Sequence, residues 1–367
     1  MSIIEFIRYY SVASLCEENE KSKAIPRHQI WNYDYFKEKE YDIKEIVPEE
    51  ESQNRLLRQL LMETIGQQKD VLRTCKVIKG KKVLYAPFLY DAYYIAFLKT
   101  IGLCYTPLVA IAQDTWDLGC TTSRLNKLKY CFLRFIAKHG VDKLLFISPE
   151  LYNHSKDYFN DPKKHIPLNH WGVDYDYYND LSIGNDCPEV LKYVNPNYVY
   201  VTGGANRDFD VMSRLAALSD GRFDVVLQSN RCPEHIIASE NLVVDRTPKG
   251  WKDLLYGYRN SMCVAVPLLQ TLGYMSGITV VLEGMACGKP IISTYSPHYP
   301  FDIEKEKVGL YVPQGDEKAW LDAVRYLLDN LDEAREMGER GRKIIKTKHN
   351  YRMFCEELER HIKTCIH

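Results

Sequence analysis

The amino-acid sequence predicts an α/β protein built from two doubly wound parallel sheets. In its first half, short apolar runs alternate with helical patterns, the runs at 3–9, 83–86, 108–112 and 144–148 and the helices at 51–73, 89–101 and 124–138. The second half repeats this alternation, with apolar runs at 198–202, 224–228, 242–244, 263–266 and 291–294 and helices at 208–219 and before Gly288. Such alternation is typical of parallel strands joined by helices.

A chain of 367 residues is long enough for two domains of ordinary size. The polar, turn-rich segment 169–197 separates the two sets of elements and places the boundary near Gly172. We therefore expect a Rossmann-like domain over 1–171 and a second one over 172–349. Two open sheets in tandem leave a cleft between the carboxyl ends of their strands, where such folds bind ligands.

Composition excludes several classes of protein. The formal net charge of −1 argues against a general nucleic-acid binder, which needs a basic surface. The 11 cysteines form no Cys-x-x-Cys pair and no zinc-spaced cluster with histidine, which indicates reduced thiols, no metal and a cytoplasmic protein. The sequence contains no run of 18 apolar residues. Segment 1–8 is a short apolar run with charges inside it, which predicts a first strand instead of a signal peptide.

The most informative segment is 277–294, which predicts a loop, a short helix and a buried strand. Gly288 ends the helix, and Pro290 follows two residues later. The N-terminus of such a helix favours anions, because its first N–H groups are unpaired and its dipole is positive there. Thr279 and Glu283 share one helix face. The Glu283 carboxylate can accept hydrogen bonds from two vicinal hydroxyls, so the segment suits a nucleoside diphosphate.

Segment 277–294 resembles the C-terminal motif of the retaining nucleotide-sugar glycosyltransferases of glycosyltransferase family 4. Further matches in the expected order lie at 166–174, 309–316 and 337–342. The resemblance implies the glycosyltransferase B architecture, two Rossmann-like domains facing across a cleft that holds the donor. It also implies that the last helix, about 350–367, packs back on the N-terminal domain.

The resemblance assigns donor contacts to this helix and to a second loop. Gly277, Ile278 and Thr279 would bind the diphosphate and Glu283 the ribose. In the second loop the assigned residues are Gly203, Gly204, Asn206 and Arg207. Relatives usually carry Gly-Arg at its start and a lysine further on. Here Gly204 stands at the arginine position and Arg207 fits the lysine position. Arg207 is therefore the expected diphosphate contact and a catalytic residue, because it would stabilise the leaving diphosphate; the alternative is a plain turn with a surface arginine.

One position departs from the family pattern. Its motif has two glutamates separated by seven residues, and the first contacts the transferred sugar. Counting back from Glu283 gives Met275, so that carboxylate is missing. The loop 274–279 resembles a small-Gly-x-Thr variant in which backbone amides would hold the sugar. The change leaves the donor sugar, and activity itself, open.

Three residues of the N-terminal half are candidates for the other side of the cleft. Gln113 and Asp114 follow the strand 108–112, where relatives place a His-Asp type dipeptide. Asp114 is assigned a catalytic role toward sugar hydroxyls or the acceptor, and the alternative is a carboxylate that caps the next turn. Gln113 and His28 are assigned to the acceptor side, although a lone histidine is more often structural.

The helix 124–138 is amphipathic and basic. Leu125, Leu128, Phe132, Phe135 and Ile136 form one stripe at helical spacing, and the opposite side gathers Arg124, Lys127, Arg134 and Lys138. One interpretation is a core-facing stripe with a solvated basic face. The other is weak docking on anionic lipid at the inner face of the membrane, where lipid-linked acceptors are found.

Together these features predict a retaining glycosyltransferase. It would move a sugar from a nucleoside diphosphate donor to a glycan or lipid-linked acceptor, in cell-surface polysaccharide or glycolipid synthesis, without a cofactor or metal. The acidic pair Asp174 and Asp176 lies at the domain junction and is not expected to bind metal. The alternatives are a nucleotide-sugar epimerase or phosphorylase on the same fold, and a non-catalytic nucleotide-sugar-binding relative.

Overall fold

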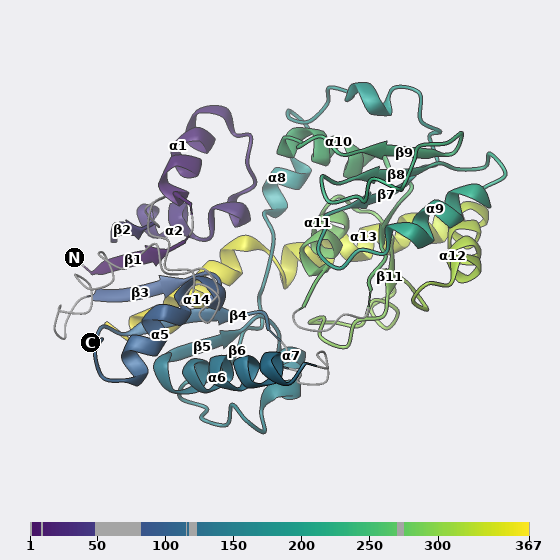
Figure 1. Cartoon of the computed structure of the whole chain (residues 1–367). Coiled ribbons are helices and arrows are strands. Elements are labelled where there is room, and N and C mark those ends of the chain that lie inside the picture. The colour runs from purple at the N-terminus through teal and green to yellow at the C-terminus, as the bar shows by residue number, and fades with distance from the viewer. Residues whose placement is uncertain are drawn as a thin grey trace.

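The computed structural model describes residues 2–8, 10–47, 82–114, 116, 123–269 and 275–366 of the chain (Figure 1). Its first sheet has six parallel strands in the order β2-β1-β3-β4-β5-β6. The strands are β1 (Ile3–Ile7), β2 (Asp42–Ile46), β3 (Lys82–Ala86), β4 (Leu108–Ala112), β5 (Lys143–Phe146) and β6 (His165–Pro167). The associated helices are α1 (Val12–Ser22), η1 (Arg27–Ile30), α2 (Tyr33–Glu38), η3 (Leu89–Ala92), α5 (Tyr93–Thr100), α6 (Arg124–Gly140) and α7 (Pro149–Ser155).

The second sheet also has six parallel strands, in the order β12-β11-β10-β7-β8-β9. They are β7 (Val199–Thr202), β8 (Val225–Gln228), β9 (Leu242–Asp245), β10 (Cys263–Val266), β11 (Ile291–Thr294) and β12 (Gly309–Val312). The helices of this half are α9 (Phe209–Ala217), α10 (Trp251–Asn260), α11 (Ile278–Ala286), α12 (Glu317–Asp329) and α13 (Leu331–Thr347). Between the sheets run α8 (Tyr175–Asn179) and η5 (Glu189–Leu191).

The predicted fold class is confirmed, because both halves form parallel sheets joined by helices. Strands β4, β10 and β11 have the predicted limits. Their residues are fully buried, as expected for strands covered on both faces. The prediction did not include β2, β6 or β12, which lie at sheet edges. The predicted helix at 51–73 lies outside the described residues.

The last helix, α14 (Tyr351–Lys363), crosses back from the second half to the first (Figure 1). The Tyr35 and Tyr41 hydroxyls each donate to the Glu359 carboxylate at 2.9 Å. The rings of Phe354 and Trp171 lie 4.9 Å apart. These contacts tie the end of the chain to elements of its first half. The boundary near Gly172 stays a prediction.

The two segments that connect the sheets run side by side. Val173 and Asn350 form a parallel bridge. A Cβ on Gly172 would lie 2.3 Å from the His349 carbonyl oxygen, closer than any side chain tolerates. Glycine at 172 therefore permits the close approach of the connections.

The predicted core stripe of the helix α6 is wrong for several residues. Leu125, Leu128 and Phe135 are 79%, 71% and 47% exposed, whereas the buried residues are Leu133, Ile136, Ala137 and Gly140. Gly140 explains the orientation, because a Cβ there would lie 1.9 Å from the Ala96 carbonyl oxygen of α5. The small face of α6 thus packs on α5 and leaves much of the apolar stripe outside.

The basic side of α6 is divided as well. Arg134 and Lys138 lie over the Tyr158 ring, at 4.1 and 4.6 Å from its centroid, so they are not part of a freely solvated face. Arg124 and Lys127, near the start of the helix, are exposed. Across the described parts of the chain, no helix combines the length and apolar content needed to cross a membrane.

Candidate active site

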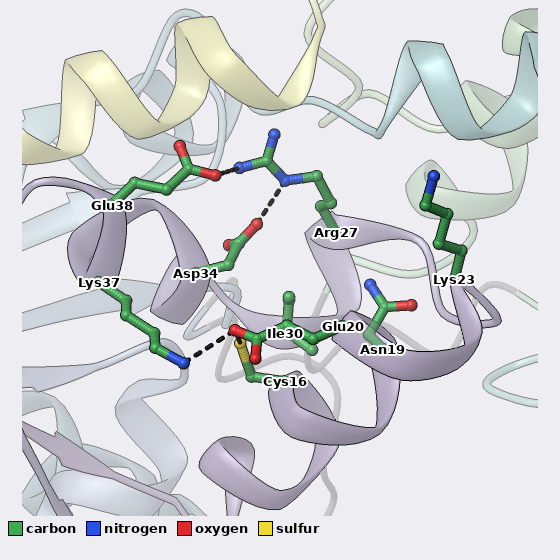
Figure 2. A pocket seen from close by; sticks show the side chains of 9 residues that line it. All are labelled: Cys16, Asn19, Glu20, Lys23, Arg27, Ile30, Asp34, Lys37 and Glu38. Atoms are coloured by element: carbon green, nitrogen blue, oxygen red, sulfur yellow. Dashed lines mark hydrogen bonds and ion pairs between the residues drawn. The ribbon is translucent and has the colours of Figure 1, made fainter.

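A polar cavity of about 490 Å³ lies in the N-terminal half, beside the segment that carries His28 (Figure 2). It is lined by Cys16, Asn19, Glu20, Lys23, Arg27, Ile30, Asp34, Lys37 and Glu38. Most of its charges are already paired: Arg27 with Asp34 and Glu38, and Lys37 with Glu20. Burial, and next the nearby carboxylates, raise the pKa of the Cys16 thiol to about 11. The cavity was not predicted, because its lining comes from the three short helices α1, η1 and α2, which share no motif.

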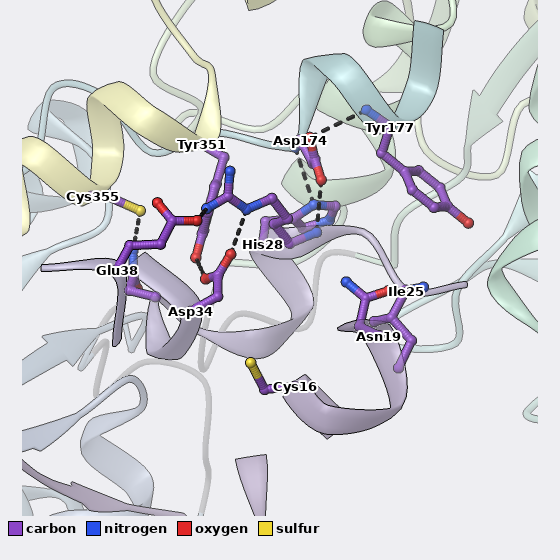
Figure 3. Close-up of polar contacts among 12 residues, drawn as sticks. Cys16, Asn19, Ile25, His28, Asp34, Glu38, Asp174, Tyr177, Tyr351 and Cys355 are labelled. Carbon is purple, nitrogen blue, oxygen red and sulfur yellow. Dashed lines mark hydrogen bonds and ion pairs between the residues drawn. The ribbon is translucent and has the colours of Figure 1, made fainter. Parts of the chain in front are cut away.

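The short helix η1 is anchored to the domain junction. The Asp174 carboxylate accepts hydrogen bonds from the Arg27 N–H at 2.8 Å and from the Tyr177 N–H at 3.2 Å, the second capping α8. The Asp174 N–H in turn donates to His28 Nδ1 at 3.2 Å (Figure 3). Because Nδ1 accepts, the neutral imidazole carries its proton on Nε2. Asp174 is thus occupied with the backbone, and among the described residues no three potential metal ligands gather into a site.

His28 reaches across to Glu283, the residue predicted to bind ribose. His28 Nε2 lies 3.1 Å from Glu283 Oε1, and the Tyr258 hydroxyl donates to Oε2 at 2.6 Å. Glu283 is only 4% exposed. A carboxylate offers about four lone-pair positions, and Tyr178 is a further hydrogen-bonding neighbour of Glu283, so at least one position remains for a hydroxyl of a ligand. Sequence reasoning singled out His28 and Glu283 separately but did not predict their contact.

Tyrosines surround the Glu283 carboxylate. Tyr178, Tyr200 and Tyr258 are buried, and their rings pack against one another, with Tyr200 and Tyr258 5.2 Å apart. Burial, and next the Glu283 charge, raise the pKa of Tyr258 well above its usual value. Its hydroxyl therefore stays a hydrogen-bond donor that orients the carboxylate. Nothing in the sequence distinguishes Tyr258 from the other members of a set of 27 tyrosines.

The two predicted donor loops lie together at the start of α11. Gly277 precedes the helix with φ +86°, and a Cβ there would lie 2.7 Å from the Tyr299 hydroxyl, so only glycine fits. The Asn206 amide donates to the Ser276 hydroxyl at 3.4 Å. A Cβ on Gly203 would touch Val280 at 3.4 Å. The loop after β7 thus faces the first turn of α11, as the motif order predicts.

The Arg207 side chain is turned back into its own loop. It is 6% exposed, and Nε and Nη1 donate to the carbonyl oxygens of Thr202 and Ala205 at 3.2 and 3.0 Å. These bonds close the end of β7 and hold the turn in shape. The assignment of Arg207 to a diphosphate stays a prediction.

Gln113 brings the N-terminal sheet to the loop that lacks the family glutamate. The Met275 N–H donates to the Gln113 carbonyl oxygen at 2.9 Å, and Met275 is 5% exposed. Asp114 follows directly and is partly buried. Burial raises the pKa of the Asp114 carboxyl to about 7. Residues predicted for opposite sides of the cleft therefore meet at two places, His28 with Glu283 and Gln113 with Met275.

Known proteins share the fold of this chain and a stretch of its sequence. Residues 227–330 match the family model described as Glycosyl transferases group 1. A stretch of 77 residues is 36% identical to the D-inositol 3-phosphate glycosyltransferase of Saccharomonospora viridis; it covers 21% of this chain and 17% of that relative. Sucrose-phosphate synthase from Thermosynechococcus elongatus superposes over 99% of both chains, with a TM-score of 0.70 and 11% identity.

Anabaena HepE, solved in complex with UDP-glucose, superposes over 99% of this chain and 100% of its own, with a TM-score of 0.68 and 11% identity. The protein thus has the two-domain glycosyltransferase B fold of these enzymes. Within the second half, residues 227–330 match the Glycosyl transferases group 1 family. The resemblance found in the sequence is confirmed for the fold and for this stretch, and membership of family 4 itself stays a prediction.

Proposed function

We propose that the protein is a retaining glycosyltransferase that transfers a sugar from a nucleoside diphosphate donor to a glycan or lipid-linked acceptor. One observation carries the proposal: Glu283 lies one turn into α11, whose first turn is next to the loop 203–207, and it faces His28 of the opposite half. A buried carboxylate next to a helix N-terminus suits a ribose attached to a diphosphate.

Each group has a defined task in this proposal. The N–H groups at the start of α11, at Ile278 and Thr279, bind the diphosphate and stabilise it as it leaves. Glu283 holds the ribose hydroxyls, and His28 and Tyr258 fix its carboxylate. Asp114 approaches the transferred sugar from the N-terminal sheet. No metal is required, because positive groups of the chain itself meet the leaving charge.

UDP is the first nucleotide to test. HepE was solved with UDP and with UDP-glucose, and two of the other similar structures are trehalose-phosphate synthases, one of them described as UDP-forming. For the acceptor side and the place of action, we propose a cytoplasmic enzyme of polysaccharide or glycolipid synthesis that docks transiently on anionic membrane through the exposed start of α6.

Met275 favours one alternative, a non-catalytic module that binds a nucleotide sugar. Purified protein should be screened by thermal shift with UDP, GDP and ADP, because a ligand that binds only the folded state raises its stability. The best nucleotide should then be offered as its sugars, with and without candidate acceptors, and release of the diphosphate measured. Release supports the transferase. Binding without release under every condition would support the module, and a failure of every nucleotide to bind would overturn both.

A further inference from the structure

The space beside Gly204 is filled by an arginine from the neighbouring loop. A Cβ on Gly204 would lie 2.5 Å from Arg231 Cδ, 2.6 Å from its Cβ and 2.8 Å from its Cγ. Cβ atoms do not approach other atoms so closely, so Arg231 can lie there only because residue 204 is glycine. Gly204 is not among the positive-φ glycines, which means that steric space and not backbone conformation requires it.

The loop that carries Arg231 is held firmly in place. The Arg231 N–H donates to the Ser229 hydroxyl at 3.2 Å, and the Ser229 N–H donates to the Asp245 carbonyl oxygen at 2.9 Å. Further along, Arg246 Nε donates to the Cys232 carbonyl oxygen at 2.9 Å, and its Nη2 donates to two more carbonyl oxygens of the loop. Arg246 therefore acts as a positioning residue for the loop after β8.

The guanidinium of Arg231 differs from that of Arg207. Arg207 is buried and bonded to its own loop. Arg231 is exposed, and within the described residues its guanidinium makes no hydrogen bond or ion pair. An exposed guanidinium on a fixed loop is available to a ligand, and only the ordering of its side chain opposes binding.

Arg231 also lies at the edge of the sheet where the strands have their carboxyl ends, the same edge as the loop 203–207. β7 and β8 are parallel neighbours whose last residues, Thr202 and Gln228, are paired in register. The loops that follow them therefore emerge together, and the first of these loops touches α11 through Gly203 and Val280. The aliphatic part of the Arg231 side chain occupies the place that the Cβ of a larger residue at position 204 would take.

We propose that Arg231 is the cation that contacts the diphosphate of the donor, in the space left by glycine at 204, and that Arg207 shapes the loop beneath it. The inference rests on the proposed function, since it assigns a residue to the same nucleotide site. It explains why the arginine expected at 204 can be absent from a nucleotide-binding loop.

Calorimetric titration of purified variants tests the proposal. The ligands are the diphosphate that the wild type binds best among UDP, GDP and ADP, and the matching nucleoside. Arg231→Ala should weaken diphosphate binding about tenfold or more, the factor expected for one hydrogen bond between charged groups, and leave nucleoside binding within about twofold. Arg222→Ala is the matched control, because Arg222 is an exposed arginine of the same half that pairs with Asp329. It should bind as the wild type does.

Gly204→Ala should produce the same selective loss, because the added Cβ displaces the Arg231 stem. The double variant should lose little beyond either single one, since both changes remove the same contact. Thermal melts check that each variant is folded. If Gly204→Ala does not fold, Arg231→Ala alone tests the proposal. Equal diphosphate binding by the wild type and Arg231→Ala would overturn the assignment while leaving the proposed function standing. A wild type that binds none of the three diphosphates would overturn both.

Discussion

Glu283→Gln should weaken nucleotide binding and lower stability at the same time. The wild-type carboxylate accepts from two buried donors, His28 Nε2–H and the Tyr258 hydroxyl. An amide presents one acceptor and one donor group. Whichever way it is oriented, the proton of one of these partners loses its acceptor. The NH₂ group also cannot accept a ribose hydroxyl.

The size of both effects follows from these contacts. A buried donor left without an acceptor costs about 1–3 kcal/mol of folding free energy. A hydrogen bond to a charged group is worth about 1.5–3 kcal/mol, so losing one from the ribose should raise Kd about ten- to a hundredfold. Tyr258→Phe separates the two effects, because it removes one donor but keeps the carboxylate. It should lower stability and change nucleotide binding much less.

Calorimetric titration with the best nucleoside diphosphate measures binding, and chemical denaturation measures stability. Glu339→Gln is the matched control, since Glu339 is exposed and pairs with Arg342 on the surface of the same half. It should leave both quantities unchanged. A folded Glu283→Gln protein that binds nucleotide as tightly as the wild type would refute the ribose assignment.

Three further predictions concern pH, metal and membrane. Because burial raises the pKa of Asp114 to about 7, ionisation of this carboxyl opposes folding, so the wild type should lose stability from about pH 4 to about pH 7. Asp114→Asn should lose less, and parallel melting curves of the two at pH 5 and pH 8 would contradict this. Sugar transfer should survive EDTA; complete loss that manganese or magnesium restores would disprove metal independence. Anionic vesicles should sediment more wild type than neutral ones at low salt, and Arg124→Glu/Lys127→Glu should abolish the difference, since each basic residue contributes about 1 kcal/mol; equal sedimentation of wild type and variant would exclude this surface.

The sheet interiors could be predicted from sequence, whereas the edge strands β2, β6 and β12 were missed. β4 and β10 consist entirely of Leu, Val, Ala, Ile or Cys and are buried throughout, so a continuous apolar run marks them. β2 contains Asp42, Lys44 and Glu45, and only Ile46 in it is fully buried. An edge strand pairs on one side only and needs no apolar run. Such a strand can therefore lack a comparable signal, although the edge strand β9 (Leu242–Asp245) does carry an apolar run.

Helix α6 shows a different limit. Its apolar stripe was real, but periodicity does not say which face a helix turns to the core. The approach of Gly140 to Ala96 decides the orientation, and that contact joins two helices that are separated in the chain by β4. The same limit applies to Glu283: a local motif predicts the carboxylate, while His28 reaches it from 255 residues away.

The two positions that depart from the family pattern, Gly204 and Met275, lie in neighbouring loops. Each of them has a contact with a residue from another part of the chain. Counting along the chain assigns a missing cation to Gly204 and a missing carboxylate to Met275. In a parallel sheet, however, successive loops emerge at one edge, and Arg231 from the next loop lies over Gly204. The Met275 N–H is hydrogen-bonded to the carbonyl oxygen of Gln113, the residue that precedes Asp114 in the opposite half. We therefore expect Arg231→Ala and Asp114→Asn to impair transfer more than a substitution of Met275 that leaves Gln113 and Asp114 in place.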